Sequence, residues 1–209
     1  MLVVQPAEER VLGARAMRAD NVWQRFGTPD YVLGFHVSSS RPTGTVNVLE
    51  GPNNAGADTV DIIVHGIGAH GASPHRGKDP VLIGSQIVVA LQTLVARELP
   101  PRAPGVVTVG SFHSGTKHNI ISDRAHLQLT VRNTYDETRQ ILLEGIERIA
   151  INVGRAAGLP EDKLPEVIVS EESVPPNVND ANLARRLKVA WAEHMGDDVI
   201  LQEQPSGMG

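Results

Sequence analysis

The histidines between positions 63 and 75 are the residues of this chain best suited to chemistry. His65, His70 and His75 recur at five-residue intervals within Ile-Val-His-Gly-Ile-Gly-Ala-His-Gly-Ala-Ser-Pro-His. An apolar run at 60–64 precedes them and an Asp-Pro pair at 79–80 follows, a pattern typical of strand, glycine-rich loop and helix. The loop therefore presents imidazoles, which can bind metals, exchange protons or donate hydrogen bonds.

Spacing alone leaves three interpretations of this loop open. A zinc site is one, but five-residue spacing places no two rings on one helical face, and the glycines with Pro74 oppose a helix. An exposed loop with incidental histidines is the default for such a segment. The third is a loop that carries one imidazole to a developing negative charge, because glycine lets the backbone approach a ligand closely.

Two adjacent carboxylates follow a short apolar run near the N-terminus. Residues 2–4 are typical of a buried strand, and Glu8 and Glu9 come soon after it. In open α/β sheets functional groups gather at the carboxyl ends of strands, where one carboxylate could bind a cation while its neighbour handles a proton. The competing interpretation is the acidic first turn of a helix over 11–17.

A second buried strand is predicted over residues 31–37, and it carries His36. A lone histidine near an apolar run is more often a satisfied core residue than a ligand, so the pattern alone assigns His36 no role. The segment 38–44 is rich in serine, proline and glycine, which predicts a linker and a domain boundary.

Beyond this boundary the apolar pattern predicts a regular domain. Its expected strands cover residues 45–50, 59–64, 106–112, 125–131 and 166–174, with a turn at 51–56. One helix is expected to begin at the Asp79 cap with Pro80 in first position and to stop at Pro100. The second is expected to open at the capping box 134–137 and to end at Gly158.

The strand at 125–131 alternates cleanly between apolar and polar side chains. Its core face carries Ala125, Leu127, Leu129 and Val131, and its other face carries His126, Gln128, Thr130 and Arg132. A sheet with one covered and one polar face is typical of an antiparallel α/β sandwich. We therefore predict an α/β protein with an α+β domain: a ferredoxin-like four-stranded antiparallel sheet, two helices on one face, and one extra strand.

This domain is predicted to interrupt a larger α/β domain. The expected division is a fragment of the larger domain at 1–41, the inserted domain at 42–175, and a return to the larger domain at 176–209, where an amphipathic helix covers 182–194. The apolar start and the loop-like end are unusual for natural termini. We therefore expect a fragment of a longer protein.

Composition narrows the functional class. Hydrophobic residues make up 41% of the 209 residues but aromatic residues only 3%, so the core must be aliphatic. A net charge of -5 without basic runs argues against nucleic acid as a partner. The absence of cysteine excludes disulfides and thiolate metal sites. No apolar run of about 20 residues and no signal-peptide pattern is evident, which predicts a cytoplasmic protein without a membrane span.

Several motifs, in order, resemble the metal-dependent aminoacylase and carboxypeptidase family, in the amidohydrolase branch that includes hippurate hydrolase and indoleacetyl-amino-acid hydrolases. The matching segments are 5–9 (Gln-Pro-Ala-Glu-Glu), 34–37 (Gly-Phe-His-Val), 68–75 with Asp-Pro at 79–80, 115–121, 130–132 and 205–209. The resemblance covers essentially the whole chain. Ser122 departs from the pattern, since the family often has proline there.

The resemblance implies a role for six residues. Glu8 would be the general base that activates a metal-bound water, and Glu9 and His36 would be metal ligands. His70 would be the lid imidazole that stabilises the oxyanion of the tetrahedral intermediate, often in a partner subunit's site. Asn119 and Arg132 would hold the carboxylate or carbonyl of the substrate.

The resemblance also implies cofactors and partners. We expect two divalent ions (Zn, Mn, Co or Ni) in the intact enzyme, an N-acyl or N-aroyl amino acid as substrate, and a homodimer formed through the lid domain. The family's Cys-Gly-His-Asp element and its last histidine ligand have no counterpart in these 209 residues. We therefore expect this chain alone to be inactive. The alternative is a non-catalytic lid or dimerisation module.

Overall fold

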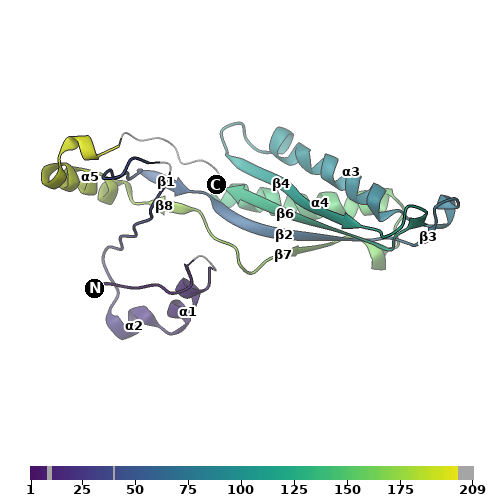
Figure 1. The fold of residues 1–209 in the computed structure, drawn as a ribbon, viewed down its shortest axis with the longest axis horizontal. Helices are drawn as coiled ribbons and strands as arrows, with labels where there is room; N and C mark the ends of the chain where they lie inside the picture. The colour runs from purple at the N-terminus through teal and green to yellow at the C-terminus, as the bar shows by residue number, and fades with distance from the viewer. Residues whose placement is uncertain (9–10, 40, 202–209) are drawn as a thin grey trace. The chain divides into compact units, whose positions relative to one another are not determined.

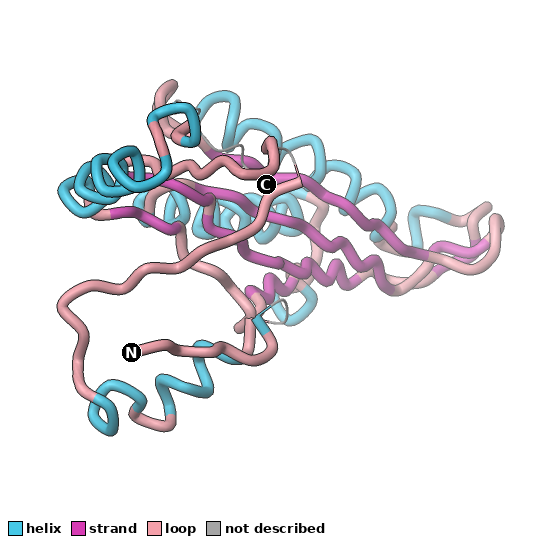
Figure 2. The backbone as a smooth tube through the Cα atoms, turned by 60° about the vertical axis from the view of Figure 1, so that its left-hand side comes forward, coloured by secondary structure: helices cyan, strands magenta, loops and turns pink. Residues whose placement is uncertain are grey.

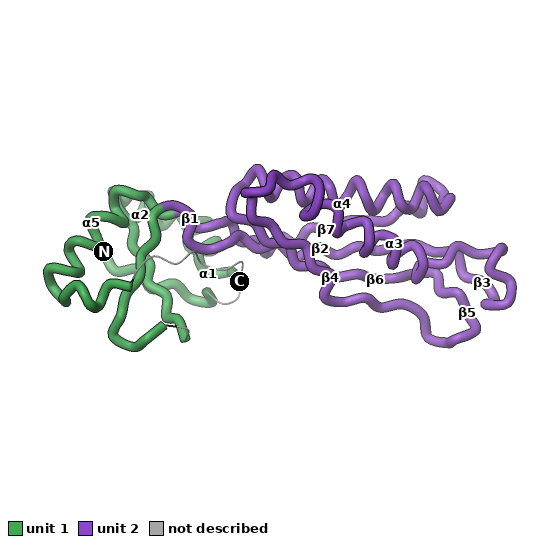
Figure 3. Tube along the Cα trace, turned by 90° about the horizontal axis from the view of Figure 1, so that it is seen from above, with its two compact units in different colours: residues 1–50, 179–204 green, residues 51–178, 205–209 purple. Residues whose placement is uncertain are grey.

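The computed structural model describes residues 1–8, 11–39 and 41–201. The chain divides into two compact units (Figure 3). Unit 1 comprises residues 1–50 and 179–204, and unit 2 comprises residues 51–178 and 205–209.

Unit 2 is built on a four-stranded antiparallel sheet (Figures 1 and 2). Its strands in spatial order are β4 (Gly105–Ser114), β6 (Arg124–Asn133), β2 (Gly56–His65) and β7 (Glu166–Val169). Helix α3 (Pro80–Thr93) connects β2 to β4, and α4 (Asp136–Ala156) connects β6 to β7. This β-α-β-β-α-β order with antiparallel neighbours is the ferredoxin-like arrangement, so the predicted fold class is confirmed.

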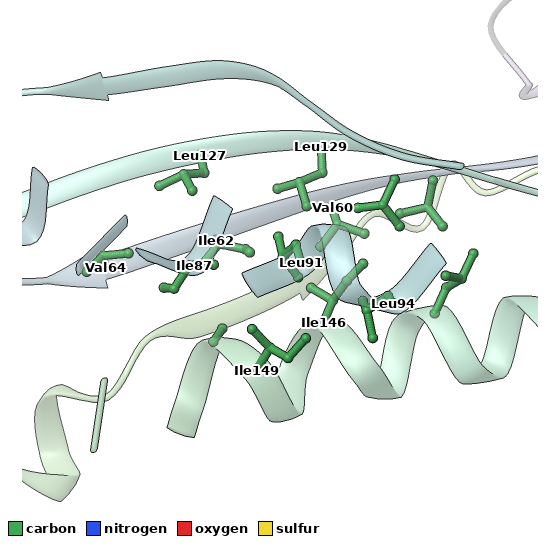
Figure 4. Close-up of a cluster of buried hydrophobic side chains, with 14 of the residues drawn as sticks. Val60, Ile62, Val64, Ile87, Leu91, Leu94, Leu127, Leu129, Ile146 and Ile149 are labelled. Atoms are coloured by element: carbon green, nitrogen blue, oxygen red, sulfur yellow. The ribbon is translucent and has the colours of Figure 1, made fainter. Parts of the chain in front are cut away.

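The aliphatic core lies between one face of this sheet and the two helices (Figure 4). The alternating residues of β6 that were predicted to face the core are all buried. Val60, Ile62 and Val64 of β2 are buried as well. The helices contribute a stripe at helical spacing: Ile83, Ile87, Leu91 and Leu94 from the first, and Leu142, Ile146 and Ile149 from the second. Each such side chain stabilises the fold by roughly 1.5–3 kcal/mol through burial.

Helix α3 begins as the sequence predicts. The Asp79 side chain accepts a hydrogen bond from the backbone N–H of Val81 over 2.9 Å, and Pro80 is the first helical residue. The helix continues as a π-helical turn over Leu94–Glu98. By length and composition Pro80–Glu98 could cross a membrane, although no such segment was expected from the sequence. Its buried stripe packs in the core of unit 2, which accounts for part of its apolar composition.

Two short sheets lie at opposite ends of unit 2 (Figures 1 and 3). Strand β3 (Ala69–His70) pairs with β5 (Ile120–Ile121) beyond one end of the main sheet. Strand β1 (Gly51–Asn54) pairs with β8 (Asn177–Asn179) at the other. The sequence prediction was wrong at β1, since it placed the strand at 45–50 and a turn at 51–56. Pairing with β8 overrides the local turn preference of the Gly-Pro-Asn-Asn sequence.

Two further element boundaries differ from the prediction. Thr134 was expected to cap α4, but the N-cap is Tyr135 without a side-chain cap bond, and the buried Thr134 hydroxyl has no partner among the described residues. The last strand was expected over 166–174, but β7 ends at Val169. Beyond it the Ser170 N–H still donates to the Thr59 carbonyl over 2.9 Å, and Val174 pairs with Ala57 in an isolated bridge.

The described part of unit 1 contains three α-helices, α1 (Gly13–Ala19), α2 (Val22–Phe26) and α5 (Ala181–Met195), and a short 3₁₀ helix, η5 (Asp197–Val199). The predicted buried strands at 2–4 and 31–37 are wrong for this structure, because neither segment is a strand. Leu2 is 89% exposed and Val37 is 91% exposed. A strand needs backbone hydrogen bonds from a neighbour, and the described residues of unit 1 supply none to these segments.

A buried ion pair joins the sheet to the second helix. The Asp58 side chain on β2 is fully buried, and Arg139 on α4 donates to both of its oxygens over 2.8–3.1 Å. The hydrogen bond to Asp58 raises the pKa of Arg139 above its ordinary value, so the guanidinium stays charged. This pair neutralises the only charged side chain among the buried residues described for the core.

We expect Arg139→Met to lower the free energy of unfolding by about 3 kcal/mol, because it leaves the Asp58 carboxylate buried and unpaired. Urea unfolding followed by circular dichroism measures this loss. Arg148→Met is the matched control, since Arg148 lies on the same helix in an exposed pair with Glu98 and should contribute less than about 1 kcal/mol. Equal losses in the two variants would contradict the assignment.

Candidate functional site

The ring of His70 is fixed in one tautomer by its own loop. The backbone N–H of Ala72 donates a hydrogen bond to Nδ1 of His70 over 3.1 Å. An amide N–H can only donate, so Nδ1 is unprotonated and the proton of the neutral ring lies on Nε2. The exposed imidazole of His70 therefore presents an N–H donor, which suits a developing oxyanion.

Asn119 lies beside His70 because the β3–β5 ladder holds them together. The Cα partners are His70 and Ile120, and the ladder extends by a bond of 2.8 Å from the Gly71 N–H to the Asn119 carbonyl. A Cβ at Gly71 would lie 3.0 Å from that carbonyl oxygen and 3.1 Å from its carbon. A side chain at this position would crowd the Asn119 backbone, so the close approach of the two strands favours glycine here. The structure thus brings together two of the predicted site residues.

A cavity of about 580 Å³ adjoins this pair of loops. Apolar residues line part of it, and hydroxyl, basic and carboxylate side chains line the rest, among them Asp79, Ser114, Lys117, His118 and Ser122. Both serine hydroxyls donate to the Arg124 carbonyl, over 2.7 and 3.0 Å, which fixes their orientation. The loops that carry His70 and Asn119 therefore border a space that a small molecule could enter.

Arg132 lies at the opposite end of the sheet from this pair. On β6 it is opposite Ala57, whereas His65, the last residue of β2 before the histidine loop, is opposite Arg124. Eight residues of antiparallel strand between Ala57 and His65 span roughly 27 Å. Within one chain Arg132 therefore cannot contact a small substrate held by His70 and Asn119.

The polar face of the sheet carries a network that the sequence analysis missed. His126 Nε2 lies 2.5 Å from the Asp61 carboxylate, and Gln128 donates to the same oxygen over 3.1 Å. Nearer the loop end, His65 Nε2 lies 3.1 Å from Glu166. The alternation of β6 predicted that His126 and Gln128 share this face. Asp61 reaches them only through the register between β2 and β6, and this register cannot be predicted from the pattern of one strand.

Of the residues predicted to form the metal centre, two lie in the described part of unit 1. Glu8, the predicted general base, and His36, a predicted ligand, are exposed there, and Glu9, the other predicted ligand, lies outside the described residues. His36 Nδ1 is 2.7 Å from the Val37 carbonyl. A carbonyl can only accept, so Nδ1 carries the proton and the Nε2 lone pair is left for a ligand, the arrangement that metal-binding histidines commonly use.

No cluster of three His, Cys, Asp or Glu side chains able to hold a metal occurs within the described ranges. The donor types of the predicted ligands Glu9 and His36 fit a divalent ion, but two ligands are too few for a site. The three-histidine zinc interpretation of the loop likewise has no geometric support, since His65 pairs instead with Glu166.

Comparisons with known proteins support the family resemblance that the motifs indicate. Residues 53–157 match the model of the M20 peptidase dimerisation domain. The chain is 37% identical over 181 residues to thermostable carboxypeptidase 1 of Saccharolobus solfataricus, covering 86% of this chain and 44% of that protein. It is also 37% identical over 155 residues to the hippurate hydrolase of Campylobacter jejuni, covering 74% of this chain and 40% of that protein.

A solved structure shares the fold over nearly the whole chain. The crystal structure of the Bacillus subtilis YXEP protein, described as a dinuclear metal-binding peptidase from the M20 family, superposes with a TM-score of 0.72 at 27% identity. The match covers 97% of this chain and 49% of that one. The chain spans about half the length of the curated relatives it matches. By its matched domain and its relatives, the chain belongs to the M20 peptidase family.

Proposed function

We propose that this chain supplies the lid, and part of the metal-binding body, of a hydrolase that cleaves the amide bond of N-acyl or N-aroyl amino acids. Family membership supports a hydrolase of the amidohydrolase and peptidase type. The names of two relatives, a carboxypeptidase and a hippurate hydrolase, support an amino-acid amide as substrate. The observation that carries the proposal is the fixed Nε2–H tautomer of His70 beside Asn119.

His70 acts on the oxygen of the scissile carbonyl. As the tetrahedral intermediate forms, that oxygen becomes negative, and the Nε2–H of His70 donates a hydrogen bond to it. Because Ala72 already holds Nδ1, the ring needs no proton shift before it donates. Asn119, on the neighbouring strand end, can orient the substrate with its side-chain amide. The Arg132 guanidinium suits the substrate carboxylate through two parallel hydrogen bonds.

Divalent metal ions would supply the activated water of this reaction. Glu8 would take a proton from that water, and Glu9 and His36 would contribute ligands. The dinuclear description of the Bacillus subtilis relative supports this assignment. Because the described residues assemble no complete metal site, the expectation that the chain alone is inactive is part of the proposal.

The separation of Arg132 from His70 favours an active site shared between two subunits. The roughly 27 Å of strand between them exceeds the length of an N-acyl amino acid. A substrate held by all three predicted residues must therefore take His70 and Asn119 from one protomer and Arg132 from its partner. On this basis the dimer is required for catalysis.

The outer face of α3 suits the dimer interface. Val81, Leu82 and Val89 are 45%, 58% and 72% exposed, and the other exposed residues of the helix are uncharged: Ser85, Gln86, Gln92 and Thr93. An uncharged face can pack against a copy of itself about a two-fold axis without burying unpaired charges. Strand β4, ten residues long at the edge of the sheet, offers backbone groups for pairing.

Grafting tests the role of His70. We expect a Campylobacter jejuni hippurate hydrolase that carries residues 51–178 in place of its own corresponding segment to hydrolyse hippurate. In this chimera His70→Ala should lower kcat by about 100- to 1,000-fold, because one oxyanion donor is lost. His75→Ala, an exposed histidine of the same loop, is the control and should leave kcat nearly unchanged. Equal kcat values for the two variants would refute the role of His70.

Mixing two inactive chimeras tests the shared site. A dimer of one His70→Ala protomer and one Arg132→Ala protomer retains one intact site only if each site draws on both subunits. Dissociating and reassociating the two variants at equal amounts should restore about a quarter of the activity, since about half of the dimers are mixed and each has one good site of two. Activity that stays at the level of the single variants would show that each site is formed by one subunit.

Light scattering coupled to gel filtration tests the interface. We expect the 209-residue chain to be a dimer and Val89→Lys to make it monomeric, because the substitution would bury an unpaired ammonium. Ile141→Lys is the matched control on the exposed side of α4 and should remain dimeric. A monomeric native chain, or a Val89→Lys dimer, would contradict this interface.

A further inference from the structure

The loop that carries His70 is closed at its base by a reciprocal backbone pair. The N–H of Ile67 donates to the Lys78 carbonyl, and the N–H of Lys78 donates to the Ile67 carbonyl, both over 2.9 Å. Residues 67–78 therefore form a closed loop that contains β3 and the short 3₁₀ helix η2 (Pro74–Arg76). Whatever holds Lys78 in place also holds the base of this loop.

The base of the loop is closely packed at Gly77. A Cβ at Gly77 would lie 2.6 Å from the Ile67 carbonyl oxygen and 2.8 Å from the Ala69 Cβ. Backbone and side chain thus touch directly across the loop, next to β3. A displacement of Lys78 would therefore be transmitted to Ala69 and His70.

The side chain of Lys78 leaves the loop and reaches the second helix. Its ammonium donates a partly buried hydrogen bond to the Ala157 carbonyl over 2.8 Å. Ala157 is the C-cap of α4, where carbonyl groups lack helical partners and the helix dipole favours a cation. The bond joins residues 79 positions apart in the sequence.

Helix α4 is a rigid anchor for this contact. Its Leu142 and Ile146 side chains are fully buried in the core of unit 2. The loop itself is largely exposed, and among the described residues the hydrogen bond to the His70 ring comes from the backbone amide of Ala72. Lys78 thus connects the histidine loop to a helix that is anchored in the core of the unit.

We propose that Lys78 is a positioning residue for His70: its bond to the C-terminal end of α4 fixes the histidine loop and so keeps the imidazole on the Ala72 amide. The catalytic consequence rests on the proposed function, but the positioning itself does not. Lys78 contacts neither substrate nor metal in this scheme. Its effect passes through the backbone of residues 67–78.

Nuclear magnetic resonance of the 209-residue chain tests the proposal directly. In Lys78→Met we expect the ring nitrogens of His70 to shift toward a mixture of the two tautomers. We also expect hydrogen exchange of the Ile67 amide to accelerate by about tenfold, the effect of losing one hydrogen bond from a charged donor. Lys78→Arg, which keeps a charged donor, should restore most of both signals. Lys163→Met, at an exposed lysine of unit 2, is the control and should change neither.

Three results would overturn the proposal. One is an unchanged His70 ring in Lys78→Met, whether or not Ile67 exchanges faster. Another is the same acceleration at Ile62, a fully buried residue of β2, because Lys78 would then act on global stability. The third is a failure of Lys78→Arg to restore the signals.

Activity separates this proposal from the proposed function. In the hippurate hydrolase chimera, Lys78→Met should lower kcat about tenfold with little change in KM, because the oxyanion donor is misplaced and not removed. If His70→Ala leaves kcat unchanged while Lys78→Met still disturbs the His70 ring, the function is wrong and the positioning stands. If His70→Ala lowers kcat but Lys78→Met disturbs neither ring nor rate, the positioning is wrong.

Discussion

The length of the main sheet is the constraint on which the rest of unit 2 depends. Ten-residue strands packed under two helices form a rigid body, so the loops at its two ends keep a fixed separation. His70 and Asn119 share one end, and Arg132 lies near the other. A small substrate therefore meets only one end of any one lid. This geometry makes the dimer a chemical requirement in the proposed mechanism.

Backbone hydrogen bonds set the two key imidazoles in opposite tautomers. In His70 a backbone amide donates to Nδ1, so Nε2 carries the proton and is a donor. In His36 a backbone carbonyl accepts from Nδ1, so Nε2 has a free lone pair. A donor suits an oxyanion and a lone pair suits a metal ion. In the proposed function these two tautomers would serve different tasks, and each is set by a near neighbour in sequence.

The sequence predicted the parts of the fold that depend on local periodicity. The α3 cap at Asp79 and the alternating core face of β6 follow from neighbours along the chain, and both are as expected. The failures depend on partners distant in sequence. β1 forms where turn residues meet β8, the segment at 31–37 lacks a neighbouring strand among the described residues, and Asp61 reaches His126 only through strand register.

In the candidate site too, the features set by neighbours in sequence were predicted and those set by distant residues were not. The family resemblance predicted roles for His70 and Asn119, whereas their proximity comes from the β3–β5 ladder and the close approach at Gly71, which the motifs do not specify. The role proposed for Lys78 could not be predicted from the sequence, because its hydrogen-bond partner is the end of a helix 79 positions away. A residue that positions a catalytic group through the backbone need not resemble a catalytic residue. Such residues are found by following what holds a functional loop to the core.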